Sequence, residues 1–227
     1  MPRDVSLVIT AAGESTRMKS AVRKPFLDLG GRPVLYVTLE KFARIPRIGQ
    51  VILALNRADY DERDKLLSPE PPLAITDLVV GGRTRTQSVA NALAALSPAA
   101  RVVLIHDAVR PFVKPEVIKA VIASAEEHGA AIAAAPVRDT LKRVKDGAVT
   151  ETVAREGLYC AQTPQGFRRK VIEKAYRAVS KGDFSDDALL VELFGGRVAI
   201  VESPHDNIKI TTPEDLAIAR AIISLPR

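Results

Sequence analysis

The first apolar run of the chain ends in three residues with little or no side chain, Ala11, Ala12 and Gly13, and Arg17 and Lys24 follow shortly after. Small residues let a ligand approach the backbone N–H groups, and the two cations can neutralise phosphate charge. The segment contains neither GxGxxG nor GxxxxGKS/T, which argues against a dinucleotide-dependent dehydrogenase and a P-loop ATPase. It is therefore a candidate phosphate-binding loop, with a tight turn carrying solvated basic residues as the alternative.

A second candidate ligand-binding loop has the sequence GGRTRTQSV and begins at Gly81. Gly81 and Gly82 allow a ligand to approach the backbone closely, and Ser88 can cap the helix that we expect to follow. Taken alone, the segment is more typical of a turn followed by a helix cap.

Two further segments carry charged residues beside apolar ones. In HDAVRPF, Asp107 directly follows a predicted strand, and a carboxylate there can hold Mg²⁺, which prefers carboxylate, phosphate and water oxygens. Arg110 shapes the turn, and an Asp107 that only satisfies turn amides is the alternative. Lys209 lies between Ile208 and Ile210, so it is a candidate for a cation facing a cleft, although this segment is also compatible with an ordinary edge strand.

The chain has one cysteine, Cys160, and three histidines, His106, His128 and His205. A single cysteine cannot form an internal disulfide or a cysteine-rich zinc site, and the histidines do not lie at metal-ligand spacing, so we assign them no role. We expect a cytoplasmic protein from this cysteine usage and because no apolar run approaches the ~20 residues that cross a bilayer.

The net charge is +6, from 33 basic and 27 acidic residues, which raises the question of a polyanionic partner. The basic residues are scattered, without a tail or a stripe, and the chain has no Trp, four Tyr and six Phe that could stack on bases. We therefore expect no nucleic-acid partner and no membrane partner.

Short β-prone apolar runs alternate with longer helical patterns, which is typical of an α/β protein with a mostly parallel sheet flanked by helices. The predicted strands are Val5–Ile9, Val51–Leu55, Leu78–Val80, Val102–Ile105, Ala130–Ala135 and Val198–Val201. The predicted helices are Val34–Arg44, Tyr60–Leu67, Ser88–Leu96, Pro115–His128, Lys170–Ser180 and Asp186–Phe194, with a last helix capped by Thr212. Ligands of such sheets bind at the carboxyl ends of the strands, where we expect the four segments above.

Residues 138–158 interrupt this alternation. Two β-prone stretches flank Asp146 and Gly147, which is a strong hairpin signal, and the segment is too polar for a core. An isolated ribbon is marginally stable, so we expect it to cover a site or to reach a second subunit. We see no repeat or linker, and treat residues 1–227 as a single domain with this protruding hairpin arm.

Six motifs resemble those of the 2-C-methyl-D-erythritol 4-phosphate cytidylyltransferases in order and spacing. They are TAAGESTRM with Lys24, GGRTRTQSV, HDAVRPF, APVRDTLKR, QTPQGF and DNIKITTPEDL, and they extend over nearly the whole chain. The resemblance implies a Rossmann-like nucleotide-diphospho-sugar transferase fold. It implies transfer of CMP from CTP to methylerythritol phosphate, with release of pyrophosphate, in non-mevalonate isoprenoid biosynthesis. It also implies Mg²⁺ as the cofactor and a homodimer formed through the arm.

The resemblance further implies roles for individual residues. The nucleotide would be bound by Ala11, Ala12, Gly13, Gly82 and Ser88. The triphosphate and the reacting phosphoryl group would be contacted by Arg17, Lys24 and Lys209, and Asp107 would bind Mg²⁺. The methylerythritol phosphate would be held by Arg110, Thr140, Arg155, Thr163 and Ser185, with Thr140 and Arg155 acting in the site of the partner subunit.

Three positions depart from the family pattern. The chain has Arg23, Lys24 and Pro25 where Pro-Lys-Gln is frequent, Ser185 where Thr is common, and Arg83 where an acidic residue is frequent. The lysine is retained, so the departures concern fine substrate contacts rather than the reaction. The alternatives are a sister enzyme acting on ribitol 5-phosphate and a non-catalytic nucleotide- or RNA-binding protein.

Overall fold

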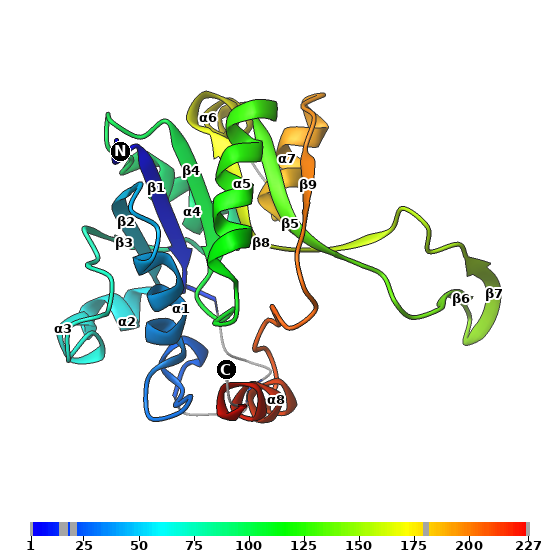
Figure 1. Ribbon diagram of the computed structural model, residues 1–227, viewed down its shortest axis with the longest axis horizontal. Coiled ribbons are helices and arrows are strands. Elements are labelled where there is room, and N and C mark those ends of the chain that lie inside the picture. The colour runs from blue at the N-terminus through cyan, green and yellow to red at the C-terminus, as the bar shows by residue number, and fades with distance from the viewer. Residues whose placement is uncertain (1, 14–17, 19–21, 179–181, 226–227) are drawn as a thin grey trace.

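The computed structural model describes residues 2–13, 18, 22–178 and 182–225 (Figure 1). Its strands are β1 (Val5–Thr10), β2 (Ile48–Leu55), β3 (Asp77–Val80), β4 (Val102–Asp107), β5 (Ala130–Pro136), β6 (Leu141–Lys145), β7 (Ala148–Val153), β8 (Tyr159–Arg168) and β9 (Ala199–Glu202). Its helices are α1 (Val34–Ala43), α2 (Arg57–Asp61), α3 (Arg63–Leu66), α4 (Arg85–Ala94), α5 (Pro115–His128), α6 (Arg169–Ala178), α7 (Asp187–Leu193) and α8 (Pro213–Ser224), with a short 3-10 helix η2 (Lys24–Phe26).

The described residues form a seven-stranded sheet in the order β3-β2-β1-β4-β8-β5-β9. Neighbouring strands run parallel except at β8, which is antiparallel to both β4 and β5. From β1 the chain proceeds outward to β2 and β3 on one side, and then returns to place β4 on the other side. Such a reversal of strand order creates a ligand-binding crevice at the carboxyl ends of the strands. The predicted α/β class with a mostly parallel sheet is confirmed.

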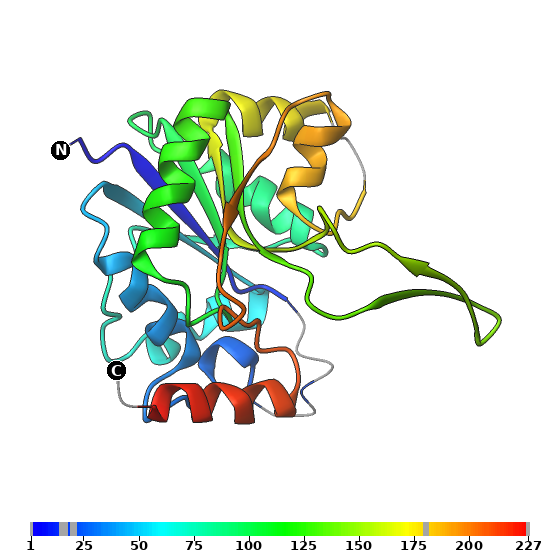
Figure 2. The same cartoon turned by 45° about the vertical axis from the view of Figure 1, so that its right-hand side comes forward.

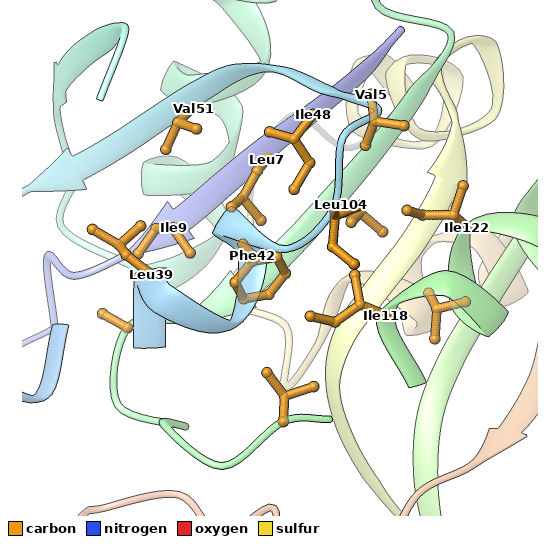
Figure 3. Packing of buried hydrophobic residues seen from close by; sticks show 14 of the residues in the cluster. Val5, Leu7, Ile9, Leu39, Phe42, Ile48, Val51, Leu104, Ile118 and Ile122 are labelled. Atoms are coloured by element: carbon orange, nitrogen blue, oxygen red, sulfur yellow. The ribbon is translucent and has the colours of Figure 1, made fainter. Parts of the chain in front are cut away.

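Two apolar layers cover the sheet, because successive residues of a strand point to opposite faces. In β1, Leu7 and Ile9 belong to the same cluster as Phe42 of α1 and Ile118 of α5 (Figure 3). Val8 belongs to the cluster on the other face, which contains residues of α4, α6 and α7. The ribbon views agree with this division, with α1 and α5 on one side of the sheet (Figures 1 and 2). The predicted helical cover on both faces is confirmed.

Helix α8 closes the end of the molecule at which β1 and β4 terminate (Figure 1). Thr212 caps it as predicted: its hydroxyl accepts from the Asp215 amide, and the Asp215 carboxylate accepts from the Thr212 amide. Leu216 and Ala219 of α8 pack in one cluster with Ile210. The last motif of the chain is thereby fixed against the body.

Strand β8 is missing from the sequence prediction, although it lies inside the sheet. Its sequence, YCAQTPQGFR, has few apolar residues and includes Pro164 and Gly166, which are unfavourable in central strands. The glycine is required here, since a Cβ would lie 2.7 Å from Val121 Cγ1 of α5. Gln165 is buried with hydrogen-bond partners in the segment around α7, so a polar residue is tolerated at the centre of the sheet.

Two smaller expectations are wrong. The helix predicted for 60–67 is two short helices, α2 and α3. Helix α4 begins at Arg85 because Thr84 is its cap, accepting from the Gln87 amide at 3.1 Å, whereas Ser88, the predicted cap, lies in the first turn. In the described chain, residues 208–210 do not form the edge strand that was the alternative interpretation of the segment around Lys209.

The hairpin formed by β6 and β7 projects away from the body, as Figures 1 and 2 show. Asp146 and Gly147 form its turn with φ values of 50° and 79°, the backbone region that a tight hairpin turn requires. The predicted arm is confirmed as a structural feature. No helix in the described parts of the chain has the length and apolar character needed to cross a membrane.

Candidate active site

The switch point between β1 and β4 places Thr10 beside Asp107. The two residues are Cα partners in the sheet, and Thr10 Oγ1 donates to Asp107 Oδ1 at 3.3 Å. The Asp107 side chain is 7% exposed. Its described partners are side chains, not the turn amides of the alternative interpretation. A buried carboxylate therefore lies at the position where this fold binds ligands.

Three cations from separate segments of the described chain surround Asp107. Lys209 Nζ lies 2.9 Å from Oδ2, and Arg110 Nε lies 3.3 Å from the same oxygen. Arg85 Nε lies 3.8 Å from Oδ1. Arg85 is also paired with Asp187, so two carboxylates face three cations, and the cluster keeps a positive excess that suits a polyanionic ligand.

The charge state of Asp107 follows from these neighbours. Burial by itself raises the pKa of this carboxyl, but the attraction of Lys209, Arg85 and Arg110 outweighs burial and holds the pKa well below its usual range. The carboxylate is therefore ionised throughout the neutral range. The expectation that Lys209 faces a site rather than bulk solvent agrees with its contact to Asp107.

His106 supports the site from behind. The ring is fully buried, with Nε2 3.1 Å from the Arg110 carbonyl oxygen and Nδ1 3.0 Å from Thr163 Oγ1. Burial lowers the pKa of His106 to about 4, so the ring is neutral at pH 7. The Nε2–H group then donates to the carbonyl, and the Thr163 hydroxyl donates to Nδ1. His106 thus fixes the orientation of Thr163, whose Oγ1 also accepts from the Asp107 amide.

Asn207 joins three segments of the site. Its Nδ2 donates to Gln162 Oε1 at 2.9 Å and to the Thr163 carbonyl at 3.0 Å. The backbone carbonyl oxygen of Asn207 accepts from Arg110 Nη1 at 2.8 Å. The side chain is fully buried, so Arg110 and Thr163 are held by one interior network.

The two small-residue loops lie against each other next to this centre. A Cβ on Gly81 would lie 2.3 Å from Ala12 Cβ and 2.9 Å from Ser88 Oγ, so only glycine permits this approach. The Gly82 amide donates to Ser88 Oγ at 3.1 Å, and that hydroxyl donates to the Thr84 carbonyl. The structure therefore brings Ala12, Gly82 and Ser88 together, and their binding of a nucleotide stays a prediction.

Besides Lys209, two further cations are expected at the phosphates, Arg17 and Lys24. Arg17 lies outside the described residues, and its role stays a prediction. Lys24 begins η2 and is 8% exposed. Leu29, a little further along, packs in one cluster with Ile210, which follows Lys209. The segments that carry Lys24 and Lys209 are therefore packed together beside α8.

Comparison with known proteins decides the family. Residues 5–225 match the family model described as 2-C-methyl-D-erythritol 4-phosphate cytidylyltransferase. The chain belongs to this family. A relative of that name from Bacillus licheniformis is 42% identical over 219 residues, which cover 96% of this chain and 94% of the relative. One from Syntrophotalea carbinolica is 42% identical over 228 residues, covering 98% and 97%.

Solved structures of cytidylyltransferases share the fold. A protein of the same name from Thermus thermophilus superposes with a TM-score of 0.80 at 36% identity, covering 98% of this chain and 100% of that one. The 4-diphosphocytidyl-2C-methyl-D-erythritol synthase from Anaerococcus prevotii gives a TM-score of 0.84 at 35% identity, covering 97% and 96%.

The residues that the cytidylyltransferase resemblance assigns to the acceptor fall into two groups. Arg110 and Thr163 lie at Asp107, whereas Thr140 precedes β6 and Arg155 follows β7 on the projecting arm (Figure 2). Arg155 donates to the Arg138 carbonyl at the base of that arm. Within one described chain, the arm residues are therefore not brought to Asp107.

Ser185, the remaining acceptor residue, is exposed just before α7. It lies two residues from Asp187, which forms an ion pair with Arg85 of the site. Its contact with an acceptor stays a prediction.

The donor set around Asp107 can be tested against a metal ion. The described residues hold no group of three or more acidic, histidine or cysteine side chains that could enclose a metal. Asp107 offers one ionised carboxylate, and Mg²⁺ is commonly held by one or two carboxylates together with substrate phosphates and water. A cytidylyltransferase with this donor set fits a cation that arrives with the nucleotide.

Sequence reasoning did not single out Arg85 or Asn207. Both lie inside motifs that it noted, GGRTRTQSV and DNIKITTPEDL. Thr84 and Gln87 have the spacing of a capping box, and that signal would have placed Arg85 in the first turn of α4. No comparable local pattern marks Asn207, whose partners are at least 44 residues away apart from Ser203 and Pro204.

Proposed function

We propose that the chain transfers CMP from CTP to 2-C-methyl-D-erythritol 4-phosphate and releases pyrophosphate, as a step of non-mevalonate isoprenoid biosynthesis. The observation that carries this proposal is the ionised Asp107 carboxylate among three described cations at the switch point. Membership of the family supplies the substrates, since its members are named for this acceptor and for cytidylyl transfer.

The reaction needs charge neutralisation more than proton transfer. An oxygen of the acceptor phosphate attacks the α-phosphorus of CTP, a new P–O bond forms, and pyrophosphate leaves with the electron pair of the broken bond. A phosphate monoester has a second pKa near ~6, so the nucleophile is mostly ionised at neutral pH without a general base. The site agrees with this requirement, because its histidine, His106, is neutral and engaged at both ring nitrogens.

The proposed division of roles combines the family resemblance with the geometry of the described residues. Arg17, Lys24 and Lys209 stabilise the triphosphate and the charge that develops on the α-phosphate. Arg110 and Thr163, held by His106 and Asn207, orient the acceptor. The nucleotide lies against the paired small-residue loops, whose members predicted to contact it are Ala11, Ala12, Gly13, Gly82 and Ser88.

Mg²⁺ is the proposed cofactor, held by Asp107 and by the phosphate oxygens of the nucleotide. When bound, it would neutralise phosphate charge and act as a Lewis acid. Asp107 contributes an ionised oxygen for this purpose, and Lys209, which contacts that carboxylate and is 40% exposed, can turn towards the phosphates.

We also propose that the protein is a homodimer in which Thr140 and Arg155 of each arm complete the partner's site. The arm supports this because nearly every residue of its two strands is exposed, including Val144 and Val149, which are paired across the strands. Two apolar side chains on an isolated ribbon are better explained by a partner surface than by solvent. The exposed free thiol of Cys160 is consistent with a reducing, cytoplasmic setting.

The activity is tested by pyrophosphate release from CTP and Mg²⁺, with methylerythritol 4-phosphate and ribitol 5-phosphate offered separately and each other NTP substituted in turn. Turnover with CTP and methylerythritol phosphate alone is expected. Turnover with ribitol phosphate alone would keep the chemistry and overturn the substrate. Ligand binding without pyrophosphate release would favour a non-catalytic binding protein, and binding of RNA would then weaken steeply with salt.

The shared site is tested by mixing two inactive variants, Arg155→Ala and Lys209→Ala, under conditions that exchange subunits. In a hybrid dimer, one site combines an intact body with an intact arm, so mixing is expected to recover about a quarter of the wild-type rate. A mixture that stays inactive while mass measurements show hybrid dimers would contradict the contribution of the arm to the partner's site.

A further inference from the structure

Arg85, the first residue of α4, lies between two carboxylates that come from different elements. Its Nη2 is 2.6 Å from Asp187 Oδ2, and its Nε is 3.8 Å from Asp107 Oδ1. The Asp187 side chain has no exposed area, and the Arg85 side chain is 22% exposed. Asp187 therefore anchors the guanidinium, and Asp107 is its second, looser partner.

Asp187 is itself rigidly held. Tyr176 of α6 donates its hydroxyl to Asp187 Oδ1 at 2.5 Å. The amides of Asp187 and Ala188 donate to Gln165 Oε1 at 3.0 and 3.1 Å. Gln165 is the sheet partner of Ile105, two residues before Asp107. The anchor of Arg85 is thus tied to the same part of the sheet as the carboxylate that Arg85 approaches.

This arrangement acts on the orientation of Asp107. Arg85 attracts Oδ1, while Lys209 and Arg110 attract Oδ2, so the carboxylate plane is set from both sides. Burial lowers the pKa of Arg85, but Asp187 and Asp107 more than offset this and the pKa lies above its usual range, so the charge is permanent. Because the buried Asp187 carboxylate holds the Arg85 guanidinium in place, Arg85 cannot move with a departing phosphate, whereas the more exposed Lys209 side chain can.

We propose that Arg85 is a positioning residue that sets the Asp107 carboxylate, and that Asp187 and Tyr176 hold Arg85 for this purpose. The inference rests on the proposed function, because its effect is read as nucleotidyl transfer. Misplacing a reacting group by a fraction of an ångström weakens the transition state more than the ground state. Loss of Arg85 is therefore expected to lower kcat and to leave KM for CTP nearly unchanged.

The chain offers a matched control for this test. Arg47 also lies between two carboxylates, 2.9 Å from Asp4 and 2.6 Å from Glu126, and its side chain is 23% exposed. Asp4 precedes β1 and Glu126 lies in the last turn of α5, at the end of the sheet opposite to Asp107. The variants Arg85→Gln and Arg47→Gln thus remove the same charge from similar surroundings, and only one of them lies beside Asp107.

The experiment compares kcat, KM for CTP and thermal unfolding for the full-length wild type and both variants. We expect Arg85→Gln to lower kcat by about 10-fold or more with KM for CTP changed by less than about 3-fold, and Arg85→Lys to recover part of kcat. Arg47→Gln should lower the unfolding temperature and leave kcat unchanged. If Arg85→Gln behaves like Arg47→Gln, or raises KM alone, the positioning role is wrong.

A double-mutant cycle tests whether Asp187 acts through Arg85. If Asp187 acts through Arg85, adding Asp187→Asn to Arg85→Gln should cause no further loss of kcat, whereas additive losses would overturn the proposed chain of contacts. Where Asp187→Asn does not fold, Tyr176→Phe, which removes one hydroxyl, takes its place in the cycle. A wild type without turnover would overturn the proposed function, and with it this inference. A working wild type with an unaffected Arg85→Gln would overturn the inference alone.

Discussion

Charge clusters at the two ends of the sheet have opposite balances. Where β1 and β2 begin, one cation, Arg47, lies between two carboxylates, Asp4 and Glu126. Where β1 and β4 end, one carboxylate, Asp107, lies among three cations of the described chain. Both are built from segments far apart in sequence, and both place a buried aspartate next to arginine. They differ in the sign of the excess charge, which is negative at Arg47 and, with the Asp187 partner of Arg85 counted, positive at Asp107.

The cluster at Arg47 is closed. Its guanidinium donates from Nε, Nη1 and Nη2, and each of the two carboxylates accepts with both oxygens. Hydrogen bonding to Glu126 is the main reason that the pKa of Arg47 lies above its usual range, and the pKa of Glu126 is lowered by the same contact. Such a cluster joins β1, β2 and α5 and has no cation left for an anionic ligand.

The Asp107 cluster is open, because its positive excess is balanced only when an anion arrives. Like charges held together without a ligand cost stability, and functional sites commonly carry such a cost. The comparison therefore teaches that the sign of the excess charge, rather than burial or the presence of ion pairs, distinguishes the end of the sheet that suits an anionic ligand.

The largest effect is expected from the cations proposed to contact the phosphates. Lys24→Ala, or Arg17→Ala, should lower kcat by ~100-fold or more, because each cation is proposed to neutralise charge that develops in the transition state. Steady-state pyrophosphate release measures this loss. A loss confined to KM would mean that the cation binds the phosphate only in the ground state, and would contradict its role in stabilising the transition state.

At the closed end, Arg47→Ala should lower the free energy of unfolding by about 2 kcal/mol, since it leaves Asp4 and Glu126 facing each other without a cation. For a chain of this length that corresponds to a fall of about 4–8 °C in Tm, and kcat below the transition should not change. Calorimetry and the pyrophosphate assay check both parts. A variant that loses kcat while keeping its Tm would contradict a purely structural cluster.

A smaller effect is expected from pH, through His106 behind the open cluster. Its folded pKa of about 4 lies below the ordinary value of 6.5, so the unfolded chain binds the proton first as the pH falls. Stability should therefore be lost on acidification, by about 1 kcal/mol between pH 6.5 and pH 5.5. Urea unfolding at several pH values measures this slope, which should flatten in His106→Gln. An equal slope in both proteins would show that the ring is not the group responsible.

The smallest effect belongs to the arm. Arg143 and Glu151 form an ion pair across β6 and β7, but both side chains are more than half exposed. Exposed pairs contribute little, so Arg143→Ala should change the free energy of unfolding by less than about 0.5 kcal/mol. Thermal unfolding provides the measurement. A larger loss would show that this pair belongs with the closed cluster rather than with ordinary surface charge.

Local sequence patterns were sufficient to predict the strands at whose ends the two clusters lie. Alternating strand and helix signals placed Asp107 at a strand end, and the hairpin signal at Asp146 and Gly147 located the arm. The capping pattern at Thr212 located the last helix. In each case the information lies within a few neighbouring residues.

Contacts between residues far apart along the chain could not be predicted from the sequence. Strand β8 is polar and contains Pro164, and its place in the sheet depends on partners such as Asp186, which is distant along the chain. Arg85 reaches the site only because α4 packs against β1 and β2, and its ion pair with Asp187 spans 102 residues. No window of sequence contains such a contact, so a positioning residue of this kind becomes visible only in the folded chain.

The most direct test of the account compares two buried aspartates, one from each cluster. Asp107→Asn and Asp4→Asn make the same change at side chains of similar exposure, 7% and 10%. Pyrophosphate release from CTP with methylerythritol 4-phosphate is measured for both variants and the wild type. The account predicts that Asp107→Asn loses ~100-fold or more in kcat while Asp4→Asn keeps the wild-type rate and unfolds at a lower temperature. Equal rates in the two variants would contradict it.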